Sequence, residues 1–258
     1  MIVITNDDGY RSHGIRILYR AAVEVFGPDK VAVVAPDKMQ SLSGMGFTVH
    51  KPLRLFNIVY EDMPCTTVSG TPADCIFVSE SYLFKNKIEM VLSGVNAGTN
   101  LSAESVYGSG TVSAAVCAAL YGIKAIAFSK NVSIDMDPDS IDKDLDTVSA
   151  RLKYLLKKLD GKRFPNDVDL LNINFPAKTA NDTPIKVTTL QRRIFENKVT
   201  KRKDPRGKDY FWLNGKLKKN LQKGSDAEGL YGGNITVSPI RVYPVPEKGL
   251  GEIKKILE

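Results

Sequence analysis

Short apolar runs alternate with helical stretches over the first 130 residues, and this alternation limits the possible folds more than any other feature of the chain. The runs cover residues 2–5, 31–35, 88–92 and 125–128. Their continuous apolar character is typical of strands that are buried on both faces. A strand, a helix and another strand in this order imply a right-handed parallel crossover. We therefore expect a doubly wound, Rossmann-like α/β fold with a mostly parallel sheet.

Helical spacing of apolar residues fills the intervals between these runs. Thr71 is a candidate N-cap, and the proline after it suits the first position of a helix. After residue 130 the same rhythm continues as far as a strand that contains LLNINF. We expect helices over residues 15–25, 72–84, 111–121, 140–159 and 247–257, and further strands over residues 170–175 and 235–240.

One basic segment interrupts this rhythm. The chain has 36 Lys and Arg against 29 Asp and Glu, a net charge of +7. Residues 191–223 hold twelve basic and three acidic residues, so this segment carries +9 and the remainder −2. It has few apolar positions, which predicts an arm or hairpin outside the core. We expect a catalytic core over residues 1–190, an extended arm over 191–233, and a C-terminal strand and helix over 234–258.

Composition excludes several classes of protein. Hydrophobic residues at 43% and charged residues at 25% are ordinary for a globular chain, and exclude disordered and collagen-like proteins. The three cysteines are an odd number without a C-x-x-C pair, which argues against a disulfide framework and a cysteine zinc site. Neither an export signal nor a membrane span is visible. We expect a cytoplasmic protein that does not act on a membrane.

An acidic pair, Asp7 and Asp8, follows the first expected strand and precedes Gly9. In open α/β sheets, ligands bind outside the carboxyl ends of the strands. Two adjacent carboxylates repel each other, and a hard cation such as Mg²⁺ or Mn²⁺ relieves that repulsion. The alternative is a simple turn, because Asn, Asp and Gly are common turn residues. A phosphoaspartate enzyme is less favoured, because its acidic residues usually stand two apart.

Loops after later strands add neutral polar groups at the same end of the sheet. Residues 108–111, GSGT, lead straight into an expected helix, whose N-terminal N–H groups suit phosphate. The alternative for this loop is a capped helix without a ligand. The loop after the second strand offers the hydroxyl of Ser41, and the loop after residue 92 offers the amide of Asn96. Together these loops predict a site with carboxylates, neutral oxygens and an anion-binding helix terminus.

Several motifs resemble those of the SurE family of survival proteins, which are divalent-metal-dependent phosphomonoesterases acting on nucleoside monophosphates. The motifs follow the family's order over most of the chain. They are TNDDG at 5–9, VVAPD at 33–37, SGTPADC at 69–75, SGVNAGTNL at 93–101, GSGTVSAA at 108–115 and DPRG at 204–207.

The resemblance implies particular site residues. One divalent ion per subunit, Mg²⁺ or Mn²⁺, would be held by Asp7, Asp8, Ser41 and Asn96. Counting without a gap from APD and from Thr48 selects Ser41, although Ser43 precedes the glycine. The implied phosphate contacts are Asn100, Ser109, Gly110 and Thr111. This chain has one extra residue before SGT, so the loop's path differs from the commoner form.

We expect hydrolysis of nucleoside 5′-monophosphates by a metal-activated water. Asn100 and the amides of residues 109–111 would stabilise the charge on phosphate, and Asp8, or alternatively Asp7, would orient or deprotonate the water. His13 is a candidate acid, with surface or capping use favoured over it; His50 is the only other histidine.

Other functions stay open at this point. An acid phosphatase or exopolyphosphatase would use the same site. A non-catalytic phosphate- or nucleic-acid-binding regulator would use the basic arm, although the arm's clustered aromatics suit packing better than stacking on nucleic acid. The resemblance implies instead that this segment is exchanged between subunits in a homodimer or homotetramer. We expect a nucleotide substrate and no nucleic-acid partner.

Overall fold

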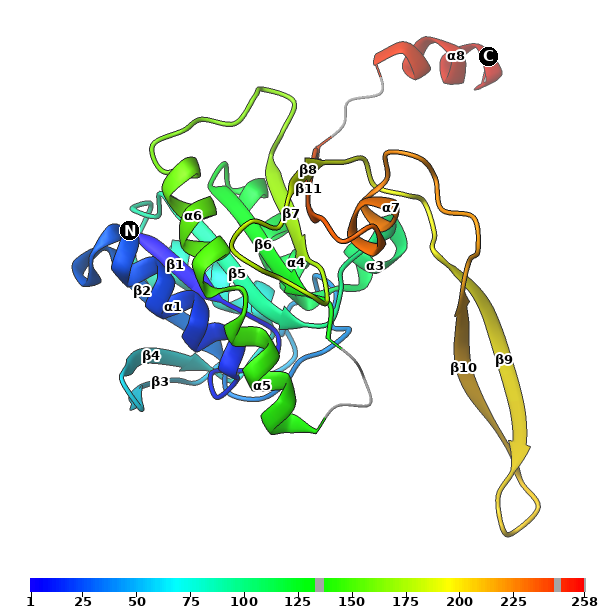
Figure 1. Cartoon of the computed structure of the whole chain (residues 1–258), viewed down its shortest axis with the longest axis horizontal. Coiled ribbons are helices and arrows are strands. Elements are labelled where there is room, and N and C mark those ends of the chain that lie inside the picture. Colours follow the sequence, from blue (N-terminus) through cyan, green and yellow to red (C-terminus); the bar gives the residue numbers. More distant parts are fainter. Residues whose placement is uncertain (133–136, 244–246, 258) are drawn as a thin grey trace.

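A mixed nine-stranded sheet forms the body of the computed structural model, which describes residues 1–132, 137–243 and 247–257 (Figure 1). Within these residues the strand order is β3-β4-β2-β1-β5-β6-β7-β11-β8. The central strands are parallel: β2 (Val31–Pro36), β1 (Ile2–Thr5), β5 (Met90–Ala97), β6 (Lys124–Lys130) and β7 (Leu170–Phe175). This confirms the mostly parallel, doubly wound α/β sheet predicted from the sequence.

Strands at both ends of the sheet were not all expected. On one side β4 (Met63–Val68) runs parallel to β2, and β3 (Leu55–Tyr60) pairs antiparallel with β4. On the other side β11 (Ile235–Ile240), which was predicted, lies antiparallel to β7, and the short β8 (Ile185–Val187) pairs with β11. The edge strands β3 and β8 are partly exposed, so they lack the continuous apolar signal of the central strands.

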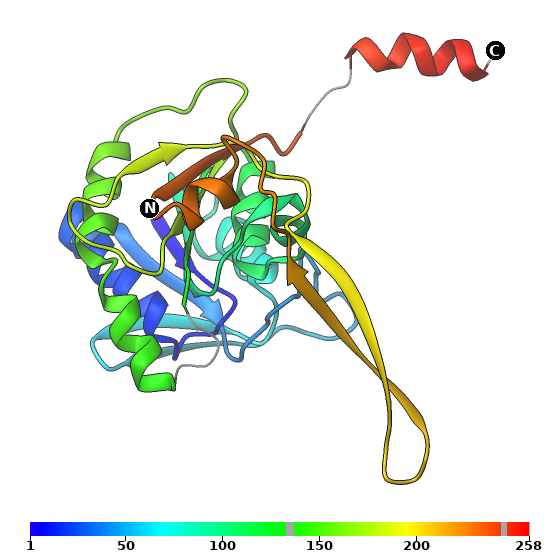
Figure 2. The same ribbon diagram turned by 45° about the vertical axis from the view of Figure 1, so that its right-hand side comes forward.

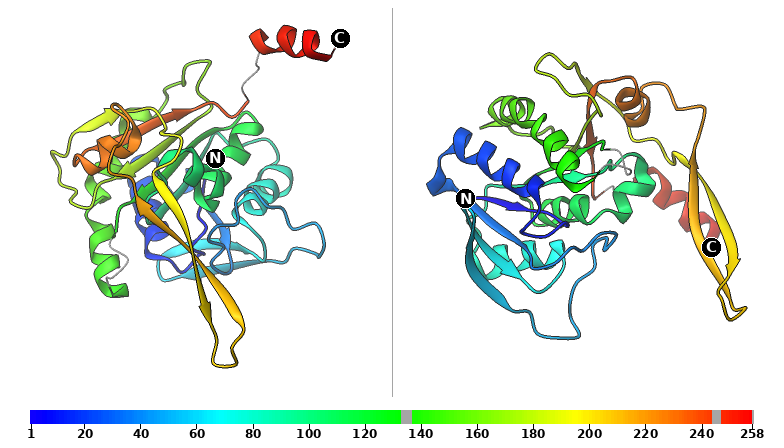
Figure 3. Two further views of the ribbon diagram at one scale, coloured as in Figure 1. Left: turned by 90° about the vertical axis from the view of Figure 1, so that its right-hand side faces the viewer. Right: turned by 60° about the horizontal axis from the view of Figure 1, so that its bottom comes forward.

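Helices cover both faces of the sheet (Figures 1 and 3). One apolar cluster joins the sheet to α1 (His13–Phe26) and α6 (Ser149–Leu159), and a second joins it to α2 (Pro72–Val78) and α4 (Gly110–Leu120). Strand β1 shows the alternation that this arrangement requires, because Ile2 and Ile4 belong to the first cluster and Val3 to the second.

Local hydrogen bonds define the helix ends. The Thr71 hydroxyl and the Asp74 carboxylate form a reciprocal capping box at the start of α2, as the predicted N-cap suggests. The α-helix ends at Val78, earlier than expected, and a π-helical turn, Ser79–Leu83, follows it. Two short helices, α3 (Ser102–Gly108) and α7 (Asp226–Tyr231), were not predicted.

The single helix expected over residues 140–159 is wrong. The structure has α5 (Pro138–Asp146) and then α6, which begins at Ser149. At the break, the backbone N–H groups of Thr147 and Val148 donate to the carbonyl groups three residues earlier instead of four. The Thr147 hydroxyl also donates to the Asp144 carbonyl, at 2.6 Å. Such a hydroxyl competes with the helical hydrogen-bond ladder, and two consecutive β-branched residues weaken the helix further.

Two segments extend from the body. A two-stranded hairpin, β9 (Phe195–Lys203) and β10 (Asp209–Leu217), projects on one side, and α8 (Glu247–Leu257) lies away from the sheet on another (Figure 2). The Asp204 carboxylate closes the hairpin turn by accepting from the N–H groups of Arg206 and Lys208, both at 2.9 Å. Among the described residues, none of the helices combines the length and apolar composition that a membrane-spanning helix requires.

Candidate active site

The acidic pair lies in a tightly held turn at the carboxyl end of β1. The buried Asn6 side chain donates from Nδ2 to the Gly9 carbonyl at 3.0 Å and to Ser12 Oγ at 2.8 Å. Gly9 has a φ of 87°, and a Cβ there would lie 3.2 Å from the Lys38 backbone. The Asn and Gly residues therefore do form a turn, and that turn presents Asp7 and Asp8 beside the later strands.

Helix α4 begins directly against Asp7. The Thr111 hydroxyl donates to Asp7 Oδ1, and the Thr111 backbone N–H also donates to this carboxylate. A Cβ on Gly110 would lie 2.7 Å from Asp7 Cβ and 2.9 Å from Ser43 Oγ. The absence of a side chain at residue 110 therefore lets the helix N-terminus approach the acidic pair.

Burial shifts both carboxyl groups toward the protonated form. Desolvation raises the pKa of Asp7, although the hydrogen bonds from Thr111 oppose the shift. Desolvation, and then repulsion from Asp7, raise the pKa of Asp8 to about 7, while a hydrogen bond from the Ala97 N–H opposes them. In the described part of the chain, neither Asp7 nor Asp8 forms an ion pair with a Lys, Arg or His.

The donor set fits a hard divalent cation. Two adjacent, largely buried carboxylates without a basic partner favour a cation, and carboxylate, amide and hydroxyl oxygens suit Mg²⁺ or Mn²⁺. Among the described residues there is no cluster of three or more His, Cys, Asp or Glu that could hold a metal ion. Any ion at the acidic pair would therefore need neutral oxygens as well as the two carboxylates.

Asn96 supplies one such neutral group at the end of β5. It precedes Ala97, whose N–H donates to the Asp8 carboxylate. The Asn96 amide nitrogen donates to the Gly98 carbonyl at 2.8 Å. This hydrogen bond does not use the amide oxygen Oδ1. The structure thus brings Asn96 to the same edge as the acidic pair.

The two serines of the loop after β2, Ser41 and Ser43, have different surroundings. The Gln40 N–H donates to the Asp7 carbonyl at 2.7 Å, which holds this loop to the acidic turn. Ser43 then lies beside Gly110, whereas the Ser41 side chain is exposed and makes no hydrogen bond within the described chain. Of the two serine hydroxyls, the one beside Gly110 is therefore that of Ser43, and a ligand role for Ser41 stays a prediction.

Three of the four residues predicted to contact phosphate, Ser109, Gly110 and Thr111, lie at the start of α4. The hydroxyl of Ser109 caps this helix by accepting from the Val112 N–H at 3.1 Å. Helix α3 ends at Gly108, and the Ser109 N–H donates back to the Ser105 carbonyl. Asn100 is buried, with 6% of its surface exposed, in the loop before α3.

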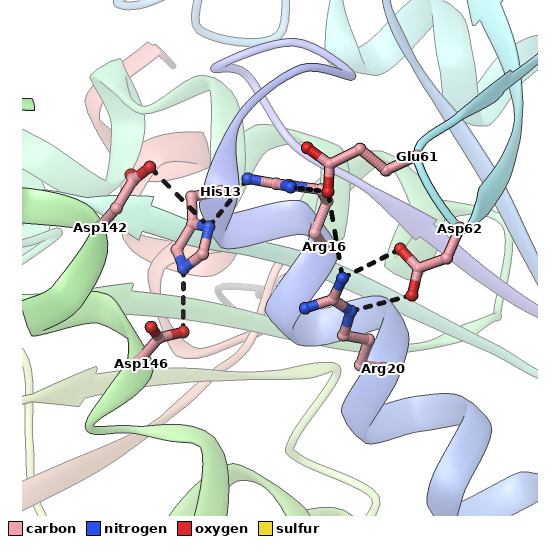
Figure 4. A network of polar contacts seen from close by, with 7 residues as sticks. All are labelled: His13, Arg16, Arg20, Glu61, Asp62, Asp142 and Asp146. Carbon is pink, nitrogen blue, oxygen red and sulfur yellow. Dashed lines mark hydrogen bonds and ion pairs between the residues drawn. The ribbon is translucent and has the colours of Figure 1, made fainter. Parts of the chain in front are cut away.

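His13 lies in a separate polar network on α1 (Figure 4). Its Nε2 is 2.9 Å from Asp146 Oδ1, and its Nδ1 is 2.9 Å from Arg16 Nη2. Arg16 in turn pairs with Glu61, in the turn between β3 and β4. The His13 side chain therefore joins α1 to α5 and makes no hydrogen bond or ion pair with Asp7 or Asp8 among the described residues.

Three polar residues near Asn100 were missed by the sequence analysis. Ser129 lies on β6, and Asn172 and Asn174 lie on β7; all three are fully buried. The sequence feature that could have indicated them is the pair of asparagines in LLNINF. Two amides on one face of a strand that is otherwise apolar and buried require polar partners.

A family model, individual relatives and a solved structure all match this chain. The family described as Survival protein SurE matches residues 2–197. A protein named 5′-nucleotidase SurE from Picrophilus torridus is 38% identical, covering 94% of this chain and 91% of that protein. A protein of the same name from Thermofilum pendens is 36% identical, covering 100% of this chain and 98% of that protein. The crystal structure of SurE protein from Aquifex aeolicus matches with a TM-score of 0.83 and 31% identity, covering 100% of this chain and 99% of that one.

Proposed function

Because this chain belongs to the survival protein SurE family, whose curated relatives are named 5′-nucleotidases, we propose that it hydrolyses nucleoside 5′-monophosphates to nucleoside and phosphate. The observation that carries this proposal is the meeting of Asp7 and Asp8 with the N-terminus of α4. This contact would place a bound cation beside a bound anion at the carboxyl edge of one sheet.

One divalent cation per subunit, Mg²⁺ or Mn²⁺, completes the proposal. Asp7, Asp8 and Asn96 would hold it, with Ser41 as the hydroxyl that the family resemblance implies. Such an ion would polarise a phosphoryl oxygen and lower the pKa of a bound water. The raised pKa of both carboxyl groups supports a cation here, since an ion between them would compensate the desolvation and repulsion that raise those values.

The protein's own groups would bind the phosphate and move the proton. The amide of Asn100 and the Gly110 N–H at the start of α4 would donate to phosphate oxygens, and would stabilise the charge that grows during hydrolysis. The Thr111 donors face Asp7, so they hold this carboxylate in place. Asp8, as one of the two carboxylates beside the proposed cation, would orient the attacking water or accept its proton.

The test is phosphate release from a panel of nucleoside 5′-monophosphates, before and after EDTA treatment and after Mn²⁺ or Mg²⁺ is restored. Asp8→Asn should lower kcat at least about a hundred-fold, as loss of a charged active-site group does. Asp29→Asn, an exposed change in the turn before β2, is the matched control and should retain full activity. Polyphosphate and simple sugar phosphates in the same panel distinguish a nucleotidase from a broad phosphatase. Full activity of Asp8→Asn would contradict the proposal.

We also propose that the hairpin binds a second copy of this chain. In the β9–β10 register, Leu213 pairs with Val199 and Leu217 with Phe195, so these apolar side chains share one face. All four are exposed, and Phe211 lies on the same face. A two-stranded ribbon is not stable alone, and an apolar face of this kind needs a partner.

The oligomer proposal is tested by mass in solution. Leu213→Glu puts a charge on the apolar face and should shift the protein from an oligomer toward a monomer in light scattering. Asn214→Glu is the matched control, because residue 214 pairs with Lys198 on the opposite face. A monomeric parent protein, or an unchanged mass for Leu213→Glu, would count against this interface.

The cysteines support our proposal of a reducing compartment such as the cytoplasm. Cys65, Cys75 and Cys117 are buried free thiols. Burial raises the pKa of Cys65 to about 12 and that of Cys117 to about 11, so both stay protonated and unreactive at neutral pH.

A further inference from the structure

Asn100 is held by three buried residues on two neighbouring strands. Its backbone N–H donates to Asn174 Oδ1 at 2.9 Å. Its carbonyl accepts from Asn172 Nδ2 at 2.8 Å and from Asn174 Nδ2 at 3.2 Å. Its own amide nitrogen donates to Ser129 Oγ at 2.8 Å. Both the backbone and the side chain of this one loop residue are therefore fixed by the sheet.

The strand register shows how these partners are brought together. Ser129 of β6 is paired on one side with Asn96 of β5 and on the other with Asn174 of β7. A row of polar residues thus crosses three strands, from the candidate cation ligand Asn96 toward the loop that carries Asn100. Each residue of the row lies in a strand whose other members are mostly apolar and buried.

Burying these groups is costly unless the partners are fixed. An amide or hydroxyl without a hydrogen bond in a protein interior costs on the order of 1–3 kcal/mol. Apolar residues at these positions of β6 and β7 would avoid that cost. Instead, Asn174 uses both ends of its amide on Asn100, which fixes the backbone of this loop in one position.

The bond to Ser129 determines which end of the Asn100 amide is presented. One N–H of the amide is occupied by Ser129, and the second N–H has no hydrogen bond to another residue in the described part of the chain. We propose that Ser129, Asn172 and Asn174 are positioning residues, which orient Asn100 so that this N–H donates to the substrate phosphate. This inference rests on the proposed phosphatase function, and it adds residues that touch neither phosphate nor cation.

The experiment is a double-mutant cycle between Ser129 and Asn100. Ser129→Ala alone should lower kcat/KM for a nucleoside monophosphate roughly ten- to a hundred-fold, the usual effect of misplacing an active-site group. In an Asn100→Ala background, the same change should cost almost nothing further, because Ser129 acts through Asn100. Ser129→Thr keeps the hydroxyl and should recover most of the activity.

Ser238→Ala is the matched control. Ser238 is also a buried serine of the same sheet, but its hydroxyl is 3.0 Å from Thr188 Oγ1 and does not bond Asn100. It should lower the thermal midpoint about as much as Ser129→Ala while leaving kcat/KM unchanged. Equal losses of activity in both variants, or additive losses of Ser129→Ala and Asn100→Ala, would overturn the positioning role.

A binding measurement separates this inference from the proposed function. In the intact protein, titration with inorganic phosphate should shift the side-chain ¹⁵N amide resonance of Asn100, and Ser129→Ala should require about ten-fold more phosphate for the same shift. If the wild type hydrolyses no nucleotide but shows this pattern, the proposed function is wrong and the positioning role stands. If nucleotides are hydrolysed and the Asn100 resonance never responds, the positioning role is wrong.

Discussion

The Thr111 hydroxyl donates a hydrogen bond to the Asp7 carboxylate, although the two residues lie 104 positions apart in the sequence. The Thr111 backbone N–H donates to the same carboxylate. The end of β1 and the start of α4 are therefore in direct contact. A cation bound by the carboxylates and a phosphate bound by the helix terminus would be neighbours there.

Removing the Thr111 hydroxyl should release Asp7. Thr111→Val keeps the shape of the side chain, and we expect it to lower kcat/KM roughly ten-fold or more and the free energy of unfolding by about 1–2 kcal/mol. Steady-state kinetics and urea denaturation measure the two effects. Thr188→Val, another buried threonine with one side-chain hydrogen bond, should lose similar stability and no activity. Normal kinetics for Thr111→Val would show that this bond is not needed.

A methyl group at residue 110 should disrupt the site. In Gly110→Ala the new Cβ would lie 2.7 Å from Asp7 Cβ and 2.9 Å from Ser43 Oγ, so α4 or the acidic turn must move. We expect activity to fall at least about a hundred-fold, because a displacement of about 1 Å has that effect on catalysis. Gly108→Ala adds the same methyl group where no atom lies within 4 Å, and it should leave the activity almost unchanged. Equal activities of the two variants would contradict this geometry.

The raised pKa of Asp8 gives a pH dependence of stability in the metal-free protein. A carboxyl group with a higher pKa in the folded state binds protons more tightly when folded, so stability falls as pH rises. For Asp8 the window runs from its ordinary value of 3.8 to about 7. With EDTA present, the free energy of unfolding of the wild type should fall across this window more steeply than that of Asp8→Asn, as measured by urea denaturation. Parallel curves would show that Asp8 is not perturbed.

The His13 network predicts a structural role for this histidine. His13→Gln should retain kcat within about three-fold, as changes away from reacting groups usually do, and should cost about 1 kcal/mol of stability through the lost contact with α5. Kinetics and thermal unfolding of the purified variant test this. A loss of activity comparable to that of Asp8→Asn would instead indicate that His13 acts as an acid catalyst.

The central sheet was predictable because its strands are buried on both faces and read as apolar runs. Strands β7 and β11 and helix α8 have the bounds that the sequence predicts. Edge strands such as β3 lack that signal, and the break at Thr147 depends on hydrogen bonds three residues back that apolar spacing does not show.

The site was predictable only as a set of loops. The acidic pair and the GSGT helix start follow strands, and parallel strands bring their carboxyl ends together. The bond between Thr111 and Asp7 depends on how closely α4 approaches β1, which the sequence does not specify. The same holds for the exposed Ser41 and the nearby Ser43, since their positions depend on the path of the loop after β2.

A crystal structure with Mn²⁺ and inorganic phosphate tests the central claim most directly. Anomalous scattering should locate one Mn²⁺ ion per subunit, ligated by Asp7, Asp8 and Asn96, with the phosphate on Asn100 and the N-terminus of α4. The same map would show whether Ser41 or Ser43 completes the site. An ion bound elsewhere, or an acidic pair that stays free of Mn²⁺ at a concentration that saturates activity, would contradict the account.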